Sequence, residues 1–237
     1  MAGLIIALDY PDRDRALKLV DLLGSEADFY KVGLELFSRW GPDAVSTLRA
    51  RGKRVFLDLK LHDIPNTVAG AVRAAAELGT DFLTVHGSGG RAMLEAAVEA
   101  SQAWEESELR ILAVTALTSL DGPGLGEAWG RDISDPRPEV LRLARLATDA
   151  GVPGVVASAQ EAAELRSAVG GQVTLVTPGI RLPGGEAHDQ ARVTTPSHAV
   201  QAGADYLVVG RAITAAADPS QALAQVQSAM SVEGEGP

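Results

Sequence analysis

The chain has 237 residues, a formal net charge of -10 and a sequence pI near 4.9. This charge argues against general attraction to nucleic acid or to anionic membranes, although a local basic pocket can still hold an anion. Zero cysteines exclude disulfides, thiolate catalysis and cysteine-bound metals. The first residues reach Asp9 after a short apolar run and carry no basic segment, so we expect no secretion signal and a cytoplasmic protein.

Short apolar runs, each followed by a segment with helical spacing of apolar residues, recur along the whole chain. The runs predict strands over residues 4–8, 29–34, 55–61, 82–86, 111–117, 154–157, 173–177 and 206–209. Helices are predicted over 12–23, 35–51, 67–78, 91–104, from a loop at 118–126 to about 150, and over 160–169, 197–202 and 220–230.

Roughly eight strand–helix units in a chain of this length predict an α/β fold, a single (β/α)8 TIM barrel. An open, doubly wound sheet is the alternative. We expect residues 1–237 to form one catalytic domain that ends in a frayed tail over about 231–237.

Polar residues follow most of the predicted strands, at the point where each strand ends. They are Asp9, Lys31, Asp58, Lys60, His86, Thr118, the run 177–181, Gly210 and Arg211. In (β/α)8 barrels the C-terminal ends of the strands and the loops that follow them form the active site. A chain that used these positions only for stability would more often fill them with small or apolar groups. The pattern therefore predicts an active site at this end of the barrel.

Two opposite charges share one face of the predicted strand 55–61. Side chains alternate along an extended strand, so Asp58 and Lys60 project to one side and the leucines around them to the other. Charges in an apolar element are costly unless they are paired. One interpretation is a buried ion pair that only fixes strand register, and the other is a reactive site. Asp63 in the next loop and Lys31 in the preceding strand favour the reactive site.

The last two predicted units have the features of an anion site. Gly210 lets the backbone approach a ligand, and Arg211 places a forked cation where a helix begins. A surface arginine at a helix start is the structural alternative for this pair. The loop that begins at Pro178 carries Arg181, Gln190 and paired glycines, and its length predicts a lid over about 181–195.

An array of Lys31, Asp58, Lys60 and Asp63 beside an anion site favours one kind of chemistry. Each lysine stabilises the ionised form of the neighbouring carboxylates, so the array exists before substrate arrives. A charged lysine can donate a proton to a developing carbanion, and a carboxylate beside it can repel a substrate carboxylate that departs during the reaction. Decarboxylation needs both effects.

The segment 56–67, FLDLKLHDIPNT, closely resembles the signature of the bacterial-type orotidine 5′-phosphate decarboxylase family. Shorter matches occur at residues 8–9, 31–33, 85–86, 117–119, 176–181 and 209–211. The resemblance implies a barrel enzyme that converts orotidine 5′-monophosphate to UMP and CO2 in pyrimidine biosynthesis. It also implies a homodimer and a reaction that needs neither a metal nor an organic cofactor.

The resemblance implies a role for each site residue as well. Lys60 donates the proton to C6 of the pyrimidine, and Asp58 crowds the departing carboxylate. Lys31 and Asp9 hold the ribose hydroxyls and brace the charges, while Thr118 reads the pyrimidine amide. The remaining substrate contacts are implied for Pro178 and for the phosphate-binding set Arg181, Gln190, Gly210 and Arg211. A last set, Asp63, Ile64 and Thr67, is implied to reach across the dimer interface into the partner's site.

Two alternative functions stay open at this point. Keto-gulonate phosphate decarboxylases and hexulose phosphate synthases resemble this barrel and use Mg²⁺, but they present a carboxylate where this chain has Lys31. A cation at that position opposes a divalent metal. A phosphate-binding barrel without catalysis is the second alternative, since a fold does not fix a function. His62 and His86 are interpreted as locally packed histidines rather than catalytic ones.

Overall fold

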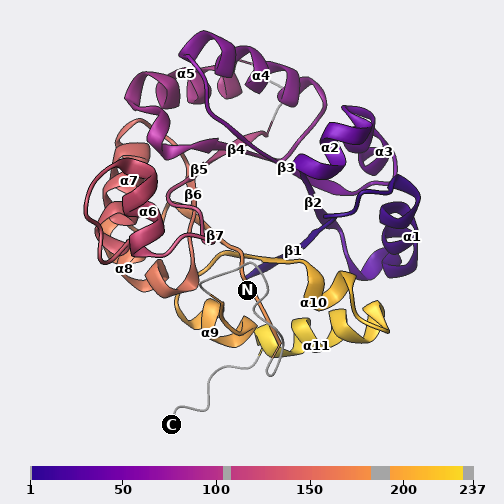
Figure 1. Ribbon diagram of the computed structural model, residues 1–237. Coiled ribbons are helices and arrows are strands. Elements are labelled where there is room, and N and C mark those ends of the chain that lie inside the picture. The colour runs from indigo at the N-terminus through magenta and orange to yellow at the C-terminus, as the bar shows by residue number, and fades with distance from the viewer. Residues whose placement is uncertain (1, 104–107, 183–192, 232–237) are drawn as a thin grey trace.

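The computed structural model describes residues 2–103, 108–182 and 193–231. Eight parallel strands follow one another around a closed barrel, because β1 pairs with β2 on one side and with β8 on the other. Figure 1 looks into the barrel and shows the helices as a ring outside the strands. The predicted (β/α)8 barrel is therefore confirmed, and the open doubly wound sheet is wrong.

The strand bounds lie within a few residues of the predicted ones. They are β1 (Gly3–Ala7), β2 (Phe29–Gly33), β3 (Arg54–Leu61), β4 (Phe82–His86), β5 (Arg110–Val114), β6 (Gly154–Val156), β7 (Thr174–Thr177) and β8 (Tyr206–Val209). Most of their positions are buried, because helices cover the outer face and packed side chains fill the inner one. This two-sided burial explains why the strands are continuous apolar runs in the sequence.

The helices differ more from their predicted bounds. They are α1 (Arg13–Leu23), α2 (Leu34–Trp40), α3 (Asp43–Arg49), α4 (Pro65–Glu77), α5 (Arg91–Gln102), α6 (Gly122–Trp129), α7 (Arg137–Asp149), α8 (Ala159–Val169), α9 (Pro196–Gln201), α10 (Arg211–Thr214) and α11 (Pro219–Ser231). Short 3₁₀ helices, η1 (Gly24–Glu26) and η2 (Gly87–Gly89), follow α1 and β4. Ser231 is the last residue of α11, and the rest of the expected tail lies outside the described residues.

Two predicted helices are each divided in two. The helix predicted over 35–51 breaks at Gly41, whose φ of 66° ends α2, and at Pro42, which precedes α3. The loop predicted over 118–126 contains the start of α6, because the Asp121 side chain accepts a 2.9 Å hydrogen bond from the Gly124 amide. Gly130, in the left-handed conformation, then separates α6 from α7.

The interior of the barrel has its own small core. Phe29, Phe56 and Phe82 point inward from β2, β3 and β4, and Tyr206 joins them from β8. The ring of Phe82 lies edge-on to those of Phe29 and Tyr206, with 5.1 Å between centroids in both pairs. These rings fill the barrel below its C-terminal end and leave that end open to polar groups.

Within the described ranges, no helix is both long enough and apolar enough to cross a bilayer.

Candidate active site

A cavity of about 550 Å³ opens at the C-terminal ends of the strands. It is lined by nine of the predicted site residues: Asp9, Lys31, Asp58, Lys60, Thr118, Pro178, Arg181, Gly210 and Arg211. They lie on or just after six different strands and span most of the chain, and barrel closure brings them to one opening. The structure thus places most of the predicted strand-end residues around one cavity, as the barrel rule predicts, whereas His86 does not line it.

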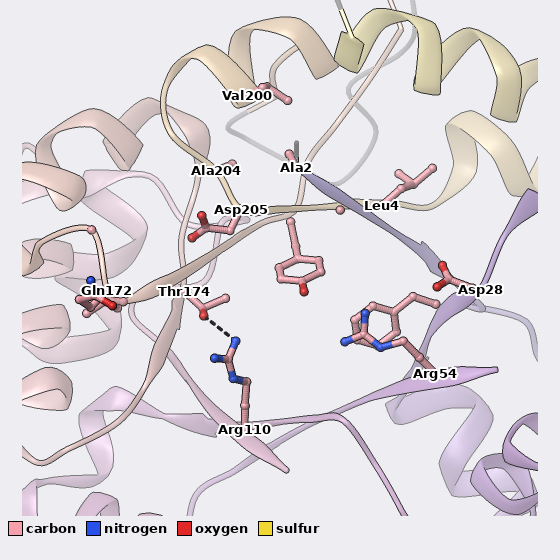
Figure 2. Close-up of a pocket in the computed structure, with 15 residues that line it drawn as sticks. Ala2, Leu4, Asp28, Arg54, Arg110, Gln172, Thr174, Val200, Ala204 and Asp205 are labelled. Atoms are coloured by element: carbon pink, nitrogen blue, oxygen red, sulfur yellow. Dashed lines mark hydrogen bonds between the residues drawn. The ribbon is translucent and has the colours of Figure 1, made fainter. Parts of the chain in front are cut away.

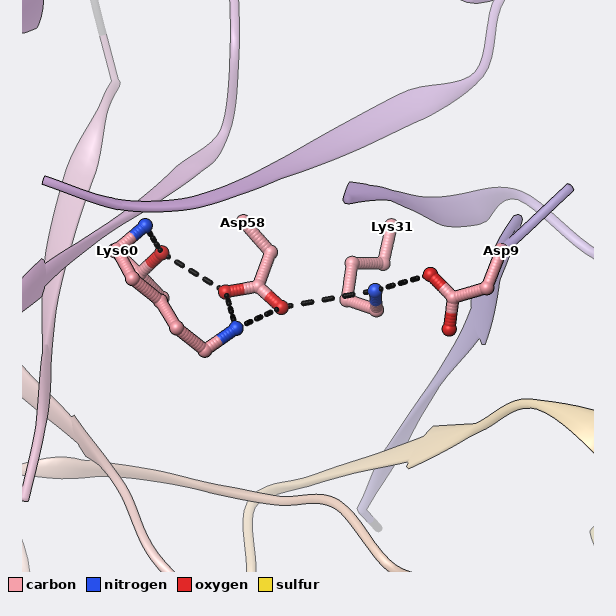
Figure 3. A network of polar contacts seen from close by, with 5 residues as sticks. Asp9, Lys31, Asp58 and Lys60 are labelled. Atoms are coloured by element: carbon pink, nitrogen blue, oxygen red, sulfur yellow. Dashed lines mark hydrogen bonds and ion pairs between the residues drawn. The ribbon is translucent and has the colours of Figure 1, made fainter. Parts of the chain in front are cut away.

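Four alternating charges run in a line along one side of this cavity (Figure 3). The Lys60 Nζ atom lies 2.8 and 2.9 Å from the two oxygens of Asp58. Asp58 also contacts Lys31, whose Nζ lies 3.6 Å from Oδ2, and Lys31 in turn donates to Asp9 at 2.7 Å. Within one chain the array therefore ends at Asp9, whereas the sequence interpretation placed Asp63 among its four charges.

The two central charges of the line are ionised because they are paired. Burial alone lowers the pKa of Lys31, but the carboxylates of Asp58 and Asp9 outweigh it and the pKa is raised. Burial raises the pKa of Asp58, but Lys31 and Lys60 outweigh it and the pKa is lowered. The side chains of Lys31 and Asp58 are only 11% and 12% exposed, so water screens this pairing weakly. Pairing therefore favours the charged forms of Lys31 and Asp58.

Strand β3 departs from regular geometry where it carries the reactive pair. Leu57 pairs with Leu83 but Leu61 pairs with Val85, so four steps along β3 face two steps along β4. Among the described residues, Lys60 is the one residue other than glycine with a positive φ, at 50°. Asp58 and Lys60 do share a face, as predicted, but through a bulge and not through regular alternation.

Gly33, at the end of β2, makes room for the charges. A Cβ atom built at this position would lie 2.9 Å from the Lys31 Nζ and 3.0 Å from the Asp9 Oδ1. The φ of Gly33 is -93°, which any residue adopts, so the need for glycine is steric and not conformational. The Lys31–Asp9 ion pair depends on this missing side chain.

The expected phosphate end of the cavity is formed by the loops after β7 and β8. Gly210 precedes α10, and Arg211 is the first residue of this short helix. The Tyr10 hydroxyl donates a 2.7 Å hydrogen bond to the Thr214 carbonyl, which holds α10 against the loop after β1. This contact fixes the end of the cavity that carries Arg211 relative to the end that carries the charge array.

The loop after β7 is closed at its base. Ile180 and Thr194 form a bridge, with the Arg181 amide donating to the Thr194 carbonyl at 2.8 Å. The Arg181 guanidinium also donates to the Ile180 carbonyl at 2.8 Å. Gln190 and most of the expected lid over 181–195 lie outside the described residues, so their predicted roles are not tested.

Three predicted residues lie away from the cavity. Asp63, Ile64 and Thr67 are exposed on the surface after β3, and Ile64 is 66% exposed. None of them lines the cavity of this chain. Nearby, the rings of His62 and His86 pack with 5.2 Å between centroids, in keeping with their interpretation as locally packed histidines.

The sequence interpretation missed some polar residues at the site. Glu35 and Ser119 line the cavity, and Thr84 on β4 lies buried behind the Asp58–Lys60 pair. The signal for Thr84 was present, because a hydroxyl interrupts an otherwise apolar strand two residues before His86. For Glu35 and Ser119 we find no such signal.

A second cavity, of about 640 Å³, lies at the opposite end of the barrel, where the strands begin (Figure 2). Arg54 and Arg110 face it, but Arg54 is paired with Asp81 at 3.0 Å and Arg110 donates to Thr174 at 3.2 Å. None of the predicted site residues lines this cavity. Although it is the larger of the two, it lacks the charge array and lies at the end that barrels use for stability.

Within the described ranges, no group of three or more His, Asp or Glu side chains is placed to hold a metal ion. The carboxylates of Asp9 and Asp58, which would be the natural oxygen ligands, are each bound to a lysine.

Comparison with known proteins agrees with the geometry. Residues 2–226 match the family model described as "Orotidine 5'-phosphate decarboxylase / HUMPS family". The orotidine 5′-phosphate decarboxylase of Photobacterium profundum is 47% identical over 229 residues, covering 95% of this chain and 97% of that protein. The enzyme of the same name from Chromobacterium violaceum is 50% identical over 228 residues, covering 96% of this chain and 91% of that protein.

The fold has a matching solved structure. The crystal structure of orotidine 5′-phosphate decarboxylase from Lactobacillus acidophilus superposes with a TM-score of 0.86 at 36% identity, covering 98% of this chain and all of that one. Sequence and structure both match over nearly the full length, so the likeness is not confined to the barrel scaffold. The chain belongs to the orotidine 5′-phosphate decarboxylase / HUMPS family.

Proposed function

We propose that this protein decarboxylates orotidine 5′-monophosphate to UMP and CO2 in pyrimidine biosynthesis, with residues 1–237 acting as one catalytic domain. The observation that carries the proposal is the line of alternating charges from Asp9 to Lys60, held at 2.7 to 3.6 Å beside the cavity. Its relatives of 47% and 50% identity bear the name of this activity.

In the proposed reaction, Lys60 is the proton donor. The bond between C6 and the carboxylate breaks, and CO2 leaves while the electron pair stays on C6. The Lys60 ammonium then gives its proton to C6, and solvent returns a proton to the neutral amine. Asp58 lies against Lys60 and repels the substrate carboxylate, which favours its departure. The contacts at 2.8 and 2.9 Å between the Lys60 Nζ and the two Asp58 oxygens hold the donor beside the departing carboxylate.

The other cavity residues are proposed to bind the substrate. Lys31 and Asp9 contact the ribose hydroxyls, and Thr118 reads the pyrimidine amide. The substrate contacts at the other end of the cavity are assigned to Pro178, Arg181, Gln190, Gly210 and Arg211. An arginine fork suits a phosphate because it donates two parallel hydrogen bonds. In a chain with net charge -10, such a local cationic site is needed to hold an anionic nucleotide.

The proposed enzyme is a homodimer in which Asp63, Ile64 and Thr67 complete the partner's site. Their exposure beside the reactive strand, and 66% exposure of the apolar Ile64, support this placement. To test it, inactive Lys60→Ala and Asp63→Ala proteins are mixed under conditions that exchange subunits. Heterodimers then contain one site with both native residues, and activity should return. Dimers that exchange subunits without regaining activity would contradict a shared site.

Turnover is tested by following the ultraviolet absorbance of orotidine 5′-monophosphate with a chelator present. We expect the absorbance to fall with wild-type protein, because no step of the proposed reaction uses a metal. No turnover by folded protein would reject the proposed function. Inhibition by the chelator would instead favour the Mg²⁺-dependent alternatives, which the position of Lys31 between two carboxylates opposes.

The assignment of Lys60 is tested by substitution. Lys60→Ala should abolish turnover while the affinity for UMP is kept, because the phosphate contacts remain. Lys18→Ala is the matched control, since Lys18 is exposed on α1 and does not line the cavity, and it should keep native turnover. A Lys60→Ala protein with near-native kcat would show that another group donates the proton.

A further inference from the structure

The conformation of Lys60 needs an explanation within the fold. A residue with a side chain at positive φ is strained by about 1–2 kcal/mol, and such strain persists only where the surroundings enforce it. Lys60, at φ 50°, is neither a glycine nor an asparagine, and it lies in a strand and not in a turn. Something next to β3 must therefore hold its backbone in place.

One buried hydroxyl makes the required contacts. The Lys60 backbone amide donates a 2.8 Å hydrogen bond to the Oγ1 atom of Thr84 on β4. The same hydroxyl donates its own proton to Asp58 Oδ1 at 2.9 Å. Thr84 thus binds the backbone of one member of the reactive pair and the side chain of the other. With one proton given and one accepted, the directions of both hydrogen bonds are fixed.

The position of Thr84 makes it a rigid support. Thr84 is 0% exposed, and it is held in β4 beside Leu112 of β5. A β-branched side chain has few χ1 rotamers, so the hydroxyl has little freedom to move. The contacts lie where the β3–β4 register shifts between Leu57 and Leu61, so the hydroxyl replaces the support that a regular ladder would give.

We propose that Thr84 is a positioning residue. Its hydroxyl holds the Lys60 backbone in the left-handed conformation and fixes the Asp58 carboxylate. The Lys60 ammonium is thereby held against Asp58, in the place from which it gives its proton to C6. Thr84 does not line the cavity and therefore does not touch the substrate. Its effect is on the geometry of the pair. The inference rests on the proposed function for its catalytic readout but not for its structural one.

The test compares three substitutions. Thr84→Val keeps the shape and removes the hydroxyl, and it should lower kcat by about 10- to 100-fold, because small displacements of reacting groups have effects of this size. KM and UMP affinity should change by less than about threefold, since the phosphate and ribose contacts stay. Thr84→Ser should restore kcat to within about threefold of wild type. Thr80→Val is the control, because Thr80 is also buried and its hydroxyl donates to a carbonyl far from the cavity.

The pH profile gives a readout that a general loss of packing would not. The hydrogen bond from Thr84 contributes to lowering the pKa of Asp58, after the larger contributions of Lys31 and Lys60. The acidic limb of the kcat profile should therefore move to higher pH in Thr84→Val and return in Thr84→Ser. A Thr84→Val protein with native kcat and an unmoved limb would overturn the proposal, as would a serine variant that stays impaired.

A measurement on the wild-type protein decides the case if Thr84→Val does not fold. The Lys60 amide should exchange its hydrogen as slowly as the amides of its β3 neighbours, because it is bound to a buried hydroxyl. Fast exchange at Lys60 would overturn the proposal without any variant. Wild-type protein that has a protected Lys60 amide but no turnover would reject the proposed function and leave the structural role of Thr84 standing.

Discussion

Replacing Asp58 by asparagine removes the central anion of the charge array while keeping the shape of the side chain. At an effective dielectric constant of about 20, its attraction to Lys60 at 2.8 Å and to Lys31 at 3.6 Å is about 6 and about 5 kcal/mol. Desolvation offsets much of this. Removing one member of a buried pair typically destabilises a protein by about 3–5 kcal/mol, because the remaining charges stay buried without a partner. We therefore expect Asp58→Asn to lower the free energy of unfolding by about 3–5 kcal/mol.

The assay is denaturant unfolding at neutral pH and fixed protein concentration, followed by circular dichroism. Asp21→Asn is the control, because Asp21 pairs with Arg51 at 3.3 Å but its side chain is 63% exposed, against 12% for Asp58. Such a surface pair contributes about 0.2–1 kcal/mol. If Asp58→Asn destabilised the protein no more than Asp21→Asn does, the charges would not be coupled as the distances imply.

The difference in stability between wild type and Asp58→Asn has a defined pH dependence. The pKa of Asp58 is lower in the folded protein than its ordinary value of 3.8. A lowered pKa gives stability that is fully present above 3.8 and is lost as the pH falls through the folded value. The difference between wild type and Asp58→Asn should therefore be constant at neutral pH and shrink below about pH 4. A difference that grew on acidification would contradict the pKa direction.

Two further predictions concern neighbouring positions. Gly33→Ala should lower kcat by about tenfold or more, because the new methyl group would lie 2.9 Å from the Lys31 ammonium. Gly171→Ala, with nothing within 4 Å of the added Cβ, should leave kcat unchanged; equal effects of the two would contradict the steric argument. Burial lowers the pKa of His86 from 6.5, and the neighbouring His62 and Lys60 lower it further. The contribution of His86 to stability is therefore lost as the pH falls below about 6.5. In His86→Gln, the midpoint of thermal unfolding should depend less on pH between pH 8 and pH 5 than it does in wild type. An unchanged pH dependence would show that His86 is not its source.

The barrel and the strands were predictable because their cause is local. Parallel strands covered on both faces must be apolar, and runs such as 82–86 and 206–209 show this directly. The helix breaks were partly visible too. Gly41 and Pro42 form a pair that commonly marks a turn, and Asp121 before a glycine and a proline has the features of a helix start. The glycines of α6 obscured that start and led to the prediction of a loop.

The site was predictable only as far as the barrel rule reaches. That rule gathers the residues at strand ends, so Lys31, Asp58 and Lys60 were expected around one opening. Lys31 pairs with Asp9 because barrel closure places β1 beside β2, and the spacing of residues in the sequence does not give the position of the Asp9 side chain. The positive φ of Lys60 arises from a contact with another strand, so no local pattern near residue 60 encodes it.

The aromatic side chains inside the barrel have a practical consequence for inhibitor design. The interior between the two cavities is filled by Phe29, Phe56, Phe82 and Tyr206, so in the part of the chain that the structure describes no channel connects the two ends of the barrel. A compound that occupies the cavity lined by Arg54 and Arg110 cannot reach the charge array at the C-terminal end of the barrel. It therefore cannot compete directly with a nucleotide there. Any inhibition by such a compound would have to act by distorting the strands, and its kinetic pattern against substrate would be noncompetitive.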